Sequence, residues 1–328
     1  MEIGSFIELQ FTKGKEWHNE EKYSAMSVAR LNSGRAAIFH AVRCLKCDTV
    51  YLPYYQCETV RLFLKRKGIK IKYYRIDKGF FPIISEEQKQ NEAIVLVNYF
   101  GVMSNMHMRN LAAKFKNIVI DNAQAFFCEP IENCMNVYSA RKFVGVSDGA
   151  YVVGKDSGEY LEDYEQGYSS DTSLFLLQRI EYGCESKTYE SRTKNEERID
   201  REDIMKMSPL TKTILDGTEY WEIRETRRKN FIFAHRLLGD INKLNPLMYY
   251  EENTVPMVYP LLVEDDTLLS RLLQAKHFQG HWWNYLLKEM SEDSFEYWLS
   301  RYIIPITIDQ RYGKEELERI NKIIREKR

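Results

Sequence analysis

The sequence predicts an α/β protein, a three-layer sandwich with a mostly parallel sheet, followed by a smaller C-terminal α/β domain. From residue 33 onward, helix-like and strand-like segments alternate, as in a sheet with helices on both faces. Two strand-like runs, AIVLVNYFG and NIVIDNAQ, are almost continuously apolar, which favours strands covered on both sides. After residue 150 the chain becomes highly charged, and helix and strand patterns return near its end.

The first elements follow from their periodicity and their end signals. The segment RAAIFHAVRCL has apolar residues three and four positions apart, which predicts a helix with one buried face. A short strand, TVYLP, ends at a proline, and it leads into CETVRLFLKRKG, a helix closed by Gly68. The run IKIKYYRI predicts another strand, ahead of the two apolar ones.

The second half of the chain predicts exposed helices and then a smaller unit. The charged segments before residue 204 indicate exposed helices and loops. The stretch from MSPLTK to HRLLGD predicts one long helix, or two joined by a break, bridging the domains. VPMVYPLLV, IIPITI and KEELERINKIIREK predict the small α/β unit. We place the large domain at residues 1–225 and the small domain at 226–328, with residues 1–30 a candidate for packing on the small domain.

The charge balance predicts small-molecule or protein partners. The 328 residues include 47 basic and 48 acidic side chains, a net charge of −1, so neither nucleic acid nor an anionic membrane is expected as a partner. No run approaches the roughly 20 apolar residues of a membrane span, and the start, MEIGSFIELQ, lacks the pattern of a signal peptide. A cytoplasmic protein is expected.

Cysteine and histidine spacing predicts no metal site. Cys44 and Cys47 have CxxC spacing, but no second ligand pair follows, which favours packed, reduced thiols. His277 and His281 have the spacing of metal ligands on a helix. Gly280 between them argues against a helix, so we expect a strand of the small domain with histidines in structural packing.

Two segments carry groups suited to a ligand. Ser33 and Gly34 precede a helix, whose free N–H groups and positive dipole end suit a phosphate, although a plain N-cap is the alternative. Asp121 ends a buried strand, and Gln124 follows three residues later. A carboxylate at that place needs a cation or good hydrogen bonds, and a helix N-cap is its alternative role.

A third segment, YSARKFVGVSDG, carries an S-x-x-K unit formed by Ser139 and Lys142. Gly145 and Gly149 allow the backbone to approach a ligand closely. A serine nucleophile with a lysine base, as in penicillin-binding proteins, is an alternative, but its companion SDN and KTG motifs are missing.

Together these segments predict one ligand, with a phosphate at Gly34, a cationic ring nitrogen at Asp121 and an aldehyde at Lys142. Pyridoxal phosphate carries all three groups. The motifs in chain order are SGRAAI, VYLPYYQCET, NYFGVMSNM, IDNAQA and YSARKFVGVSDGAYVV. In their order and spacing, over about residues 31 to 155 and more faintly to about 240, the sequence resembles the fold-type-I pyridoxal-phosphate enzymes of the aspartate aminotransferase superfamily, and within it the DegT-type sugar aminotransferases.

The resemblance implies a role for each matching residue. Lys142 would hold the cofactor as a Schiff base and, once displaced by the substrate, would transfer the proton. Asp121 would keep the pyridinium nitrogen protonated, and Gln124 would hydrogen-bond the ring's 3-oxygen. One of Tyr54 and Tyr55 would cover a face of the ring. The residues implied to hold the phosphate are Ser33, Gly34, Arg35 and Ser139.

The sequence also departs from that family. Arg35 stands where the family usually has threonine, which gives the phosphate a charge-assisted partner. The asparagine that usually reaches across the dimer has no clear match in IDREDIMKMSP, and the chain is shorter than most relatives.

The resemblance implies a homodimeric aminotransferase of sugar and polysaccharide biosynthesis. It would transfer an amino group from an amino acid, glutamate by expectation, to a keto-sugar that is expected to be nucleotide-linked. The alternative is a catalytically degenerate relative that binds pyridoxal phosphate in a regulatory or binding role.

Overall fold

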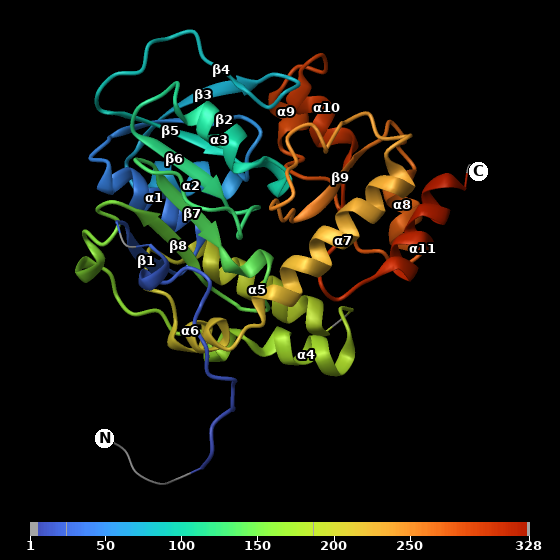
Figure 1. Cartoon of the computed structure of the whole chain (residues 1–328), viewed down its shortest axis with the longest axis horizontal. Helices are drawn as coiled ribbons and strands as arrows, with labels where there is room; N and C mark the ends of the chain where they lie inside the picture. Colours follow the sequence, from blue (N-terminus) through green and yellow to red (C-terminus); the bar gives the residue numbers. More distant parts are fainter. Residues whose placement is uncertain (1–5, 24, 186, 327–328) are drawn as a thin grey trace.

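The computed structural model describes residues 6–23, 25–185 and 187–326 (Figure 1). Within this part of the chain, the larger sheet has eight strands in the order β1-β8-β7-β6-β5-β2-β3-β4. Neighbouring strands from β3 through β2, β5 and β6 to β7 are parallel, while β1, β8 and β4 pair antiparallel. The predicted mostly parallel sheet is therefore confirmed. Its strands are β1 (Ser27–Leu31), β2 (Thr49–Pro53), β3 (Lys70–Ile76), β4 (Pro82–Ile83), β5 (Glu92–Val97), β6 (Ile118–Asn122), β7 (Met135–Ser139) and β8 (Ala150–Gly154).

The central strands are buried along their whole length, as their apolar sequences predict. Helix α1 packs across β6, β7 and β8, and its first turn is capped by the Ser33 hydroxyl, which accepts from the Ala36 N–H. The helices of the larger part are α1 (Gly34–Cys44), α2 (Glu58–Arg66), α3 (Asn105–Ala112), α4 (Leu174–Tyr182), α5 (Lys187–Arg201) and α6 (Pro209–Asp216).

The smaller part contains an antiparallel pair, β9 (Val258–Leu262) and β10 (Ile303–Thr307), as the sequence predicts. Its helices are α8 (Leu268–Gln274), α9 (Leu286–Glu289), α10 (Phe295–Tyr302) and α11 (Lys314–Arg325). Figure 1 shows α7 (Tyr220–Leu238) running between the two parts. The predicted break falls at Gly217, which separates α6 from α7.

Helix α7 is shared by two apolar clusters. Near its start, Tyr220 and Ile223 pack with Phe126 of the larger part. Farther along, Phe231 and Leu238 belong to the main core, which also includes the strands of the smaller part. The domain boundary that we placed near residue 225 therefore falls within a helix that contributes to both clusters.

Two local expectations are wrong. The sequence makes residues 1–30 a candidate for packing on the smaller part, but within this range Ser27–Arg30 belong to the edge strand β1, which pairs with β8 of the large sheet. The segment from His277 to Trp283 is a loop and not a strand, and its Trp282 and Trp283 belong to the apolar contacts of the main core. In the described residues, no helix combines the length and the apolar character needed to cross a membrane.

A buried histidine gives the fold a pH-dependent stability. His18 is fully buried, with Nδ1 2.8 Å from the Tyr23 hydroxyl and Nε2 2.8 Å from the Phe126 carbonyl oxygen. Burial lowers the pKa of His18 well below its usual value, so the folded protein holds this ring neutral. Below a pH of about 6.5 the unfolded chain binds a proton that the folded chain does not, so the free energy of unfolding falls as pH drops.

We expect this loss to reach about 1.4 kcal/mol per pH unit for His18 alone. Denaturant unfolding of the wild type and of His18→Asn at a series of pH values between about 7 and 5 measures the slope. The variant should show the shallower slope, whatever its absolute stability. Equal slopes would contradict the conclusion that the folded protein holds His18 neutral.

Candidate active site

The site lies at the carboxyl edge of β6 and β7, where the parallel strands end side by side. Asp121 of β6 is in register with Val137 of β7. Two residues later β7 ends at Ser139, and a short 3-10 helix, Ala140–Lys142, follows. Since both strands run in the same direction, the carboxylate of Asp121 and the turn that carries Lys142 belong to one edge of the sheet, where α/β proteins bind ligands.

The predicted phosphate-binding residues are brought together. A Cβ atom added to Gly34, the first residue of α1, would lie 4.0 Å from the Cβ of Ser139. Ser33 and Ser139 are both buried, and they flank this close approach of helix and strand. The N-terminus of α1 and Ser139, the last residue of β7, therefore lie close together.

The acidic and amide groups of the site are held from different segments. The buried Asp121 accepts a hydrogen bond from Gln56 Nε2 at 2.9 Å and another from the Ala123 N–H at 3.0 Å. Among the described residues, no cation lies within ion-pair distance of this carboxylate. Gln124 Oε1 accepts from the Phe100 N–H at 2.7 Å, and its Nε2 donates to no described residue.

Lys142 carries an exposed amine that has no partner among the described residues. Its side chain is exposed, and within the described part of the chain its Nζ makes no hydrogen bond and no ion pair. Its backbone is held instead, because its carbonyl oxygen accepts from Arg227 Nη2 at 3.5 Å.

Both arginines beside the predicted phosphate-binding residues are paired with carboxylates of α5. Arg35 forms an ion pair with Asp200, and Arg141 forms one with Glu196. The predicted contact of Arg35 with a phosphate thus stays a prediction, and in this structure the guanidinium charge is already engaged.

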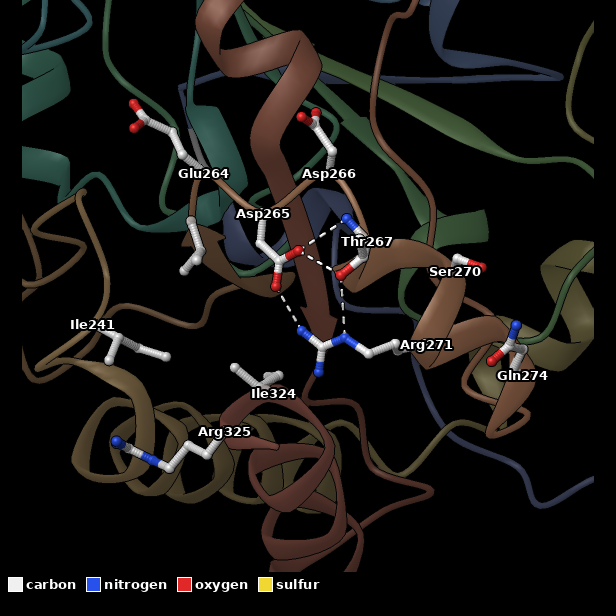
Figure 2. Close-up of a pocket in the computed structure, with 11 residues that line it drawn as sticks. Ile241, Glu264, Asp265, Asp266, Thr267, Ser270, Arg271, Gln274, Ile324 and Arg325 are labelled. Carbon is white, nitrogen blue, oxygen red and sulfur yellow. Dashed lines mark hydrogen bonds and ion pairs between the residues drawn. The ribbon is translucent and has the colours of Figure 1, made fainter. Parts of the chain in front are cut away.

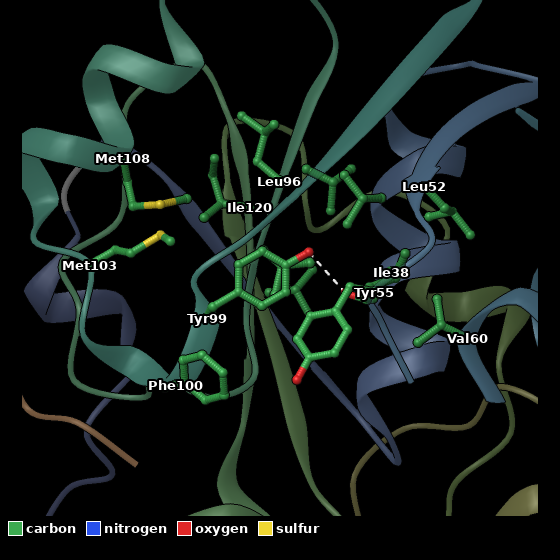
Figure 3. Close-up of a cluster of buried hydrophobic side chains, with 14 of the residues drawn as sticks. Ile38, Leu52, Tyr55, Val60, Leu96, Tyr99, Phe100, Met103, Met108 and Ile120 are labelled. Carbon is green, nitrogen blue, oxygen red and sulfur yellow. Dashed lines mark hydrogen bonds between the residues drawn. The ribbon is translucent and has the colours of Figure 1, made fainter. Parts of the chain in front are cut away.

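Tyr55, the tyrosine predicted to cover a face of the cofactor ring, lies in the main apolar core. Tyr55 is fully buried, and its ring packs against Tyr99 (Figure 3). The ring of Trp283 also packs against it, at 4.3 Å between ring centres. Burial raises the pKa of Tyr55 well above its usual value. Tyr54 stacks on Tyr73 at 5.0 Å. The side chain of this turn that reaches Asp121 is that of Gln56. Stacking of Tyr55 on a ligand stays a prediction.

No family model and no curated protein matches the chain, but solved structures do. The E. coli GDP-4-keto-6-deoxy-D-mannose-3-dehydratase with bound hydrated PLP aligns over 93% of this chain and 89% of its own, with 15% identity and a TM-score of 0.62. A DegT DnrJ EryC1 StrS aminotransferase from Brucella abortus aligns over 93% and 87%, with 14% identity and a TM-score of 0.62. NtdA from Bacillus subtilis, with bound cofactor PMP, aligns over 92% and 75%, with 14% identity and a TM-score of 0.61.

The chain has the DegT-type sugar aminotransferase fold. The fold that the sequence motifs predict is therefore confirmed, together with its second, smaller part.

Sequence reasoning missed several residues that shape this site in the DegT-type fold. Gln56 stands in a motif that we read for its tyrosines, yet its amide contacts Asp121. Trp282, for which the sequence predicts no role, stacks on Phe100 at 5.5 Å between ring centres. An apolar loop of the smaller part thus closes against the residue whose N–H binds Gln124.

Arg227 of α7 contacts the backbone of the turn that carries Lys142. Its side chain is buried, its Nη1 donates to the Met257 carbonyl oxygen at 2.8 Å, and its guanidinium lies 4.5 Å from the Phe143 ring centre. Burial lowers the pKa of Arg227 to about 10. Nothing in the sequence distinguishes Arg227 from the other charged residues of α7, so this contact could not be predicted.

Two cavities lie in different parts of the molecule. A cavity of about 980 Å³ lies between α8 and the end of α11 (Figure 2). Its Asp265 accepts from Thr267 and pairs with Arg271 at 2.6 Å, so these charges satisfy one another. A cavity of about 370 Å³ lies closer to the site, beside Gly101 and Ala125.

The backbone at Gly101 presses directly against the Gln124 segment. Gly101 has φ +71°, a conformation that favours glycine, and an added Cβ would overlap the Gln124 carbonyl oxygen. We therefore expect Gly101→Ala to displace Gln124 and to destabilise the fold by about 3 kcal/mol. Gly280→Ala is the matched control, because no atom lies within 4 Å of its added Cβ.

Thermal and denaturant unfolding of both variants measures the difference. A Gly101→Ala protein as stable as the Gly280→Ala protein would show that the close approach is not rigid.

Proposed function

We propose that the chain is a pyridoxal-phosphate-dependent aminotransferase that acts on a keto-sugar. The observation that carries the proposal is the pairing, at one sheet edge, of an amine without a described partner at Lys142 and a buried carboxylate without a described cation at Asp121. The DegT-type fold supports it, since relatives of that fold include sugar aminotransferases.

The described residues fit this cofactor. The close approach of Gly34 and Ser139, with Ser33 beside them, provides a cradle for its phosphate at the start of α1. Asp121 suits its ring nitrogen, and the Nε2 of Gln124 is available for its ring oxygen. When bound, pyridoxal phosphate supplies an electron sink for a carbanion at the substrate carbon.

Each residue then has a defined task. Lys142 Nζ would hold the cofactor covalently and, when released, would move a proton between the substrate carbon and the cofactor carbon, a task that suits a lysine amine. Arg227 holds the Lys142 carbonyl oxygen and so fixes the turn. Gln56 and the Ala123 N–H orient the Asp121 carboxylate, which would hold a proton on the ring nitrogen of a bound cofactor.

The reaction and the substrates rest on similarity. The E. coli relative is named for a GDP-linked keto-sugar, which supports a nucleotide-linked keto-sugar here. That relative is a dehydratase and others are aminotransferases. We favour transamination, with glutamate as donor, because Lys142 offers the amine that both holds the cofactor and moves the proton. A role in sugar and polysaccharide biosynthesis follows from that substrate.

Purified protein with added pyridoxal phosphate should gain the visible absorbance of cofactor bound covalently to a lysine. Lys142→Ala should lose this absorbance almost completely, because it removes the amine. Lys155→Ala, which changes another exposed lysine just after β8, should keep it. A colourless wild type, or a coloured Lys142→Ala protein, would contradict the proposal.

Addition of glutamate separates an enzyme from a protein that only binds the cofactor. An aminotransferase should lose the absorbance and release the keto acid, and a panel of keto-sugar nucleotides should then recover it. A stable absorbance with every amino donor would favour the binding role instead.

We also propose that two copies of the chain associate. Helix α4 buries its Gln178 and exposes apolar side chains, among them Leu174 at 51%, Leu177 at 53% and Ile180 at 83% exposure. An apolar face of this kind is typical of an association surface.

Sedimentation should give the mass of two chains for the wild type and for Lys155→Ala. Ile180→Glu should shift the protein toward a single chain, because it places a charge in the contact. A dimer that persists unchanged in this variant would exclude α4 from the interface.

A further inference from the structure

Helix α5 lies against both arginines at the phosphate end of the site. Arg35, in the first turn of α1, pairs with Asp200, and Arg141, between Ser139 and Lys142, pairs with Glu196. The two carboxylates are four residues apart on α5, so they lie on one face of that helix. Guanidinium groups from two separate segments therefore converge on α5. In the chain, Arg35 directly follows Gly34 and Arg141 stands two residues after Ser139, the two residues that approach each other closely.

These ion pairs are partly shielded from water. The side chains of Arg35 and Arg141 are 10% and 19% exposed, and their partners Asp200 and Glu196 are 48% and 43% exposed. Shielding from water strengthens the attraction between each arginine and its carboxylate. Each arginine therefore leaves its carboxylate only if another anion replaces it. The Nε of Arg141 is buried and has no partner among the described residues. The arginines therefore have donors to spare, since a guanidinium group carries five N–H bonds.

Helix α5 is anchored mainly at its C-terminal end. Arg66 of α2 donates to the backbone oxygens of Asp200 and Glu202 at 3.2 and 2.7 Å. In the middle, Asn195 donates to the Ser147 carbonyl oxygen at 3.1 Å, and Ile199 is buried. The acidic face thus adds two charge contacts to a helix that has few other polar attachments along its length.

We propose that α5 is an acidic latch, in which Glu196 and Asp200 hold Arg141 and Arg35 until a phosphate group displaces them. The inference rests on the proposed function for the identity of the ligand, a phosphate-bearing pyridoxal. Two carboxylates cancel the charge of two guanidinium groups, so the cradle offers a phosphate little net positive charge while α5 is in place. The carboxylates also repel the phosphate. The latch therefore weakens phosphate binding, and binding loosens α5.

The double variant Glu196→Gln/Asp200→Asn tests this directly, because it keeps the shapes and removes both charges. Absorbance titration should show that it binds pyridoxal phosphate about tenfold more tightly than the wild type at low salt. Binding of pyridoxal, which lacks the phosphate, should be unchanged. Glu197→Gln is the matched control, since Glu197 lies on the exposed side of α5 and pairs with Arg201.

Hydrogen exchange of residues 187–201 gives a second readout that does not need the covalent cofactor. Inorganic phosphate should speed the exchange of α5 in the wild type, and the double variant should exchange fast without it. Two results would overturn the latch. One is pyridoxal-phosphate binding in the double variant that is unchanged or weaker; the other is a rate of hydrogen exchange in α5 that does not change when phosphate is added. A wild type that binds neither pyridoxal form would contradict the proposed function, and the phosphate-dependent exchange would still decide on the latch.

Discussion

The parallel pairing of β6 with β7 is the constraint on which the site depends. It sets Asp121 opposite Val137, so that the strand which delivers the carboxylate and the strand which leads into Lys142 end at the same edge. A shift of one residue would turn Asp121 to the other face of the sheet, because side chains alternate along a strand. The buried, apolar flanks of both strands hold that register, and the chemistry at their ends depends on packing far from it.

Contacts from the rest of the chain then fix each polar group. Gln56 reaches the Asp121 carboxylate from the turn after β2, and Phe100 reaches Gln124 from the turn after β5. In the smaller part, the ring of Trp282 stacks on Phe100, and Arg227 of α7 donates to the Lys142 carbonyl oxygen. The Asp121 carboxylate, which pairs with no cation of the described residues, can therefore be buried, because several elements supply hydrogen-bond donors to it and its neighbours.

Much of the fold could be predicted from the sequence, because periodicity and end signals are local. The apolar runs at β5 and β6, the helix signals of α1 and α2, and the order of strand ends with their polar residues all act within a few positions of one another. The segments of the site followed from that order. Residues such as Gln56 could not be assigned, since their partners are distant in sequence and are chosen by tertiary packing.

The same limit explains the errors. Residues 27–31 look like any short strand, and their partner β8 decides where they belong. In the segment around Gly280 the glycine argued against a helix, but the two tryptophans gain more from the apolar core than from strand pairing. The ion pairs of Arg35 and Arg141 with α5 are also set by packing, because charged side chains carry no periodic signal of their partner.

Helix α7 has a consequence for how the molecule unfolds. Because its first half belongs to the cluster around Phe126 and its second half to the main core, neither part can lose its packing without removing support from the other. The chain is thus built to melt in a single cooperative step, and a fragment cut at residue 225 would carry an incomplete core on either side of the cut.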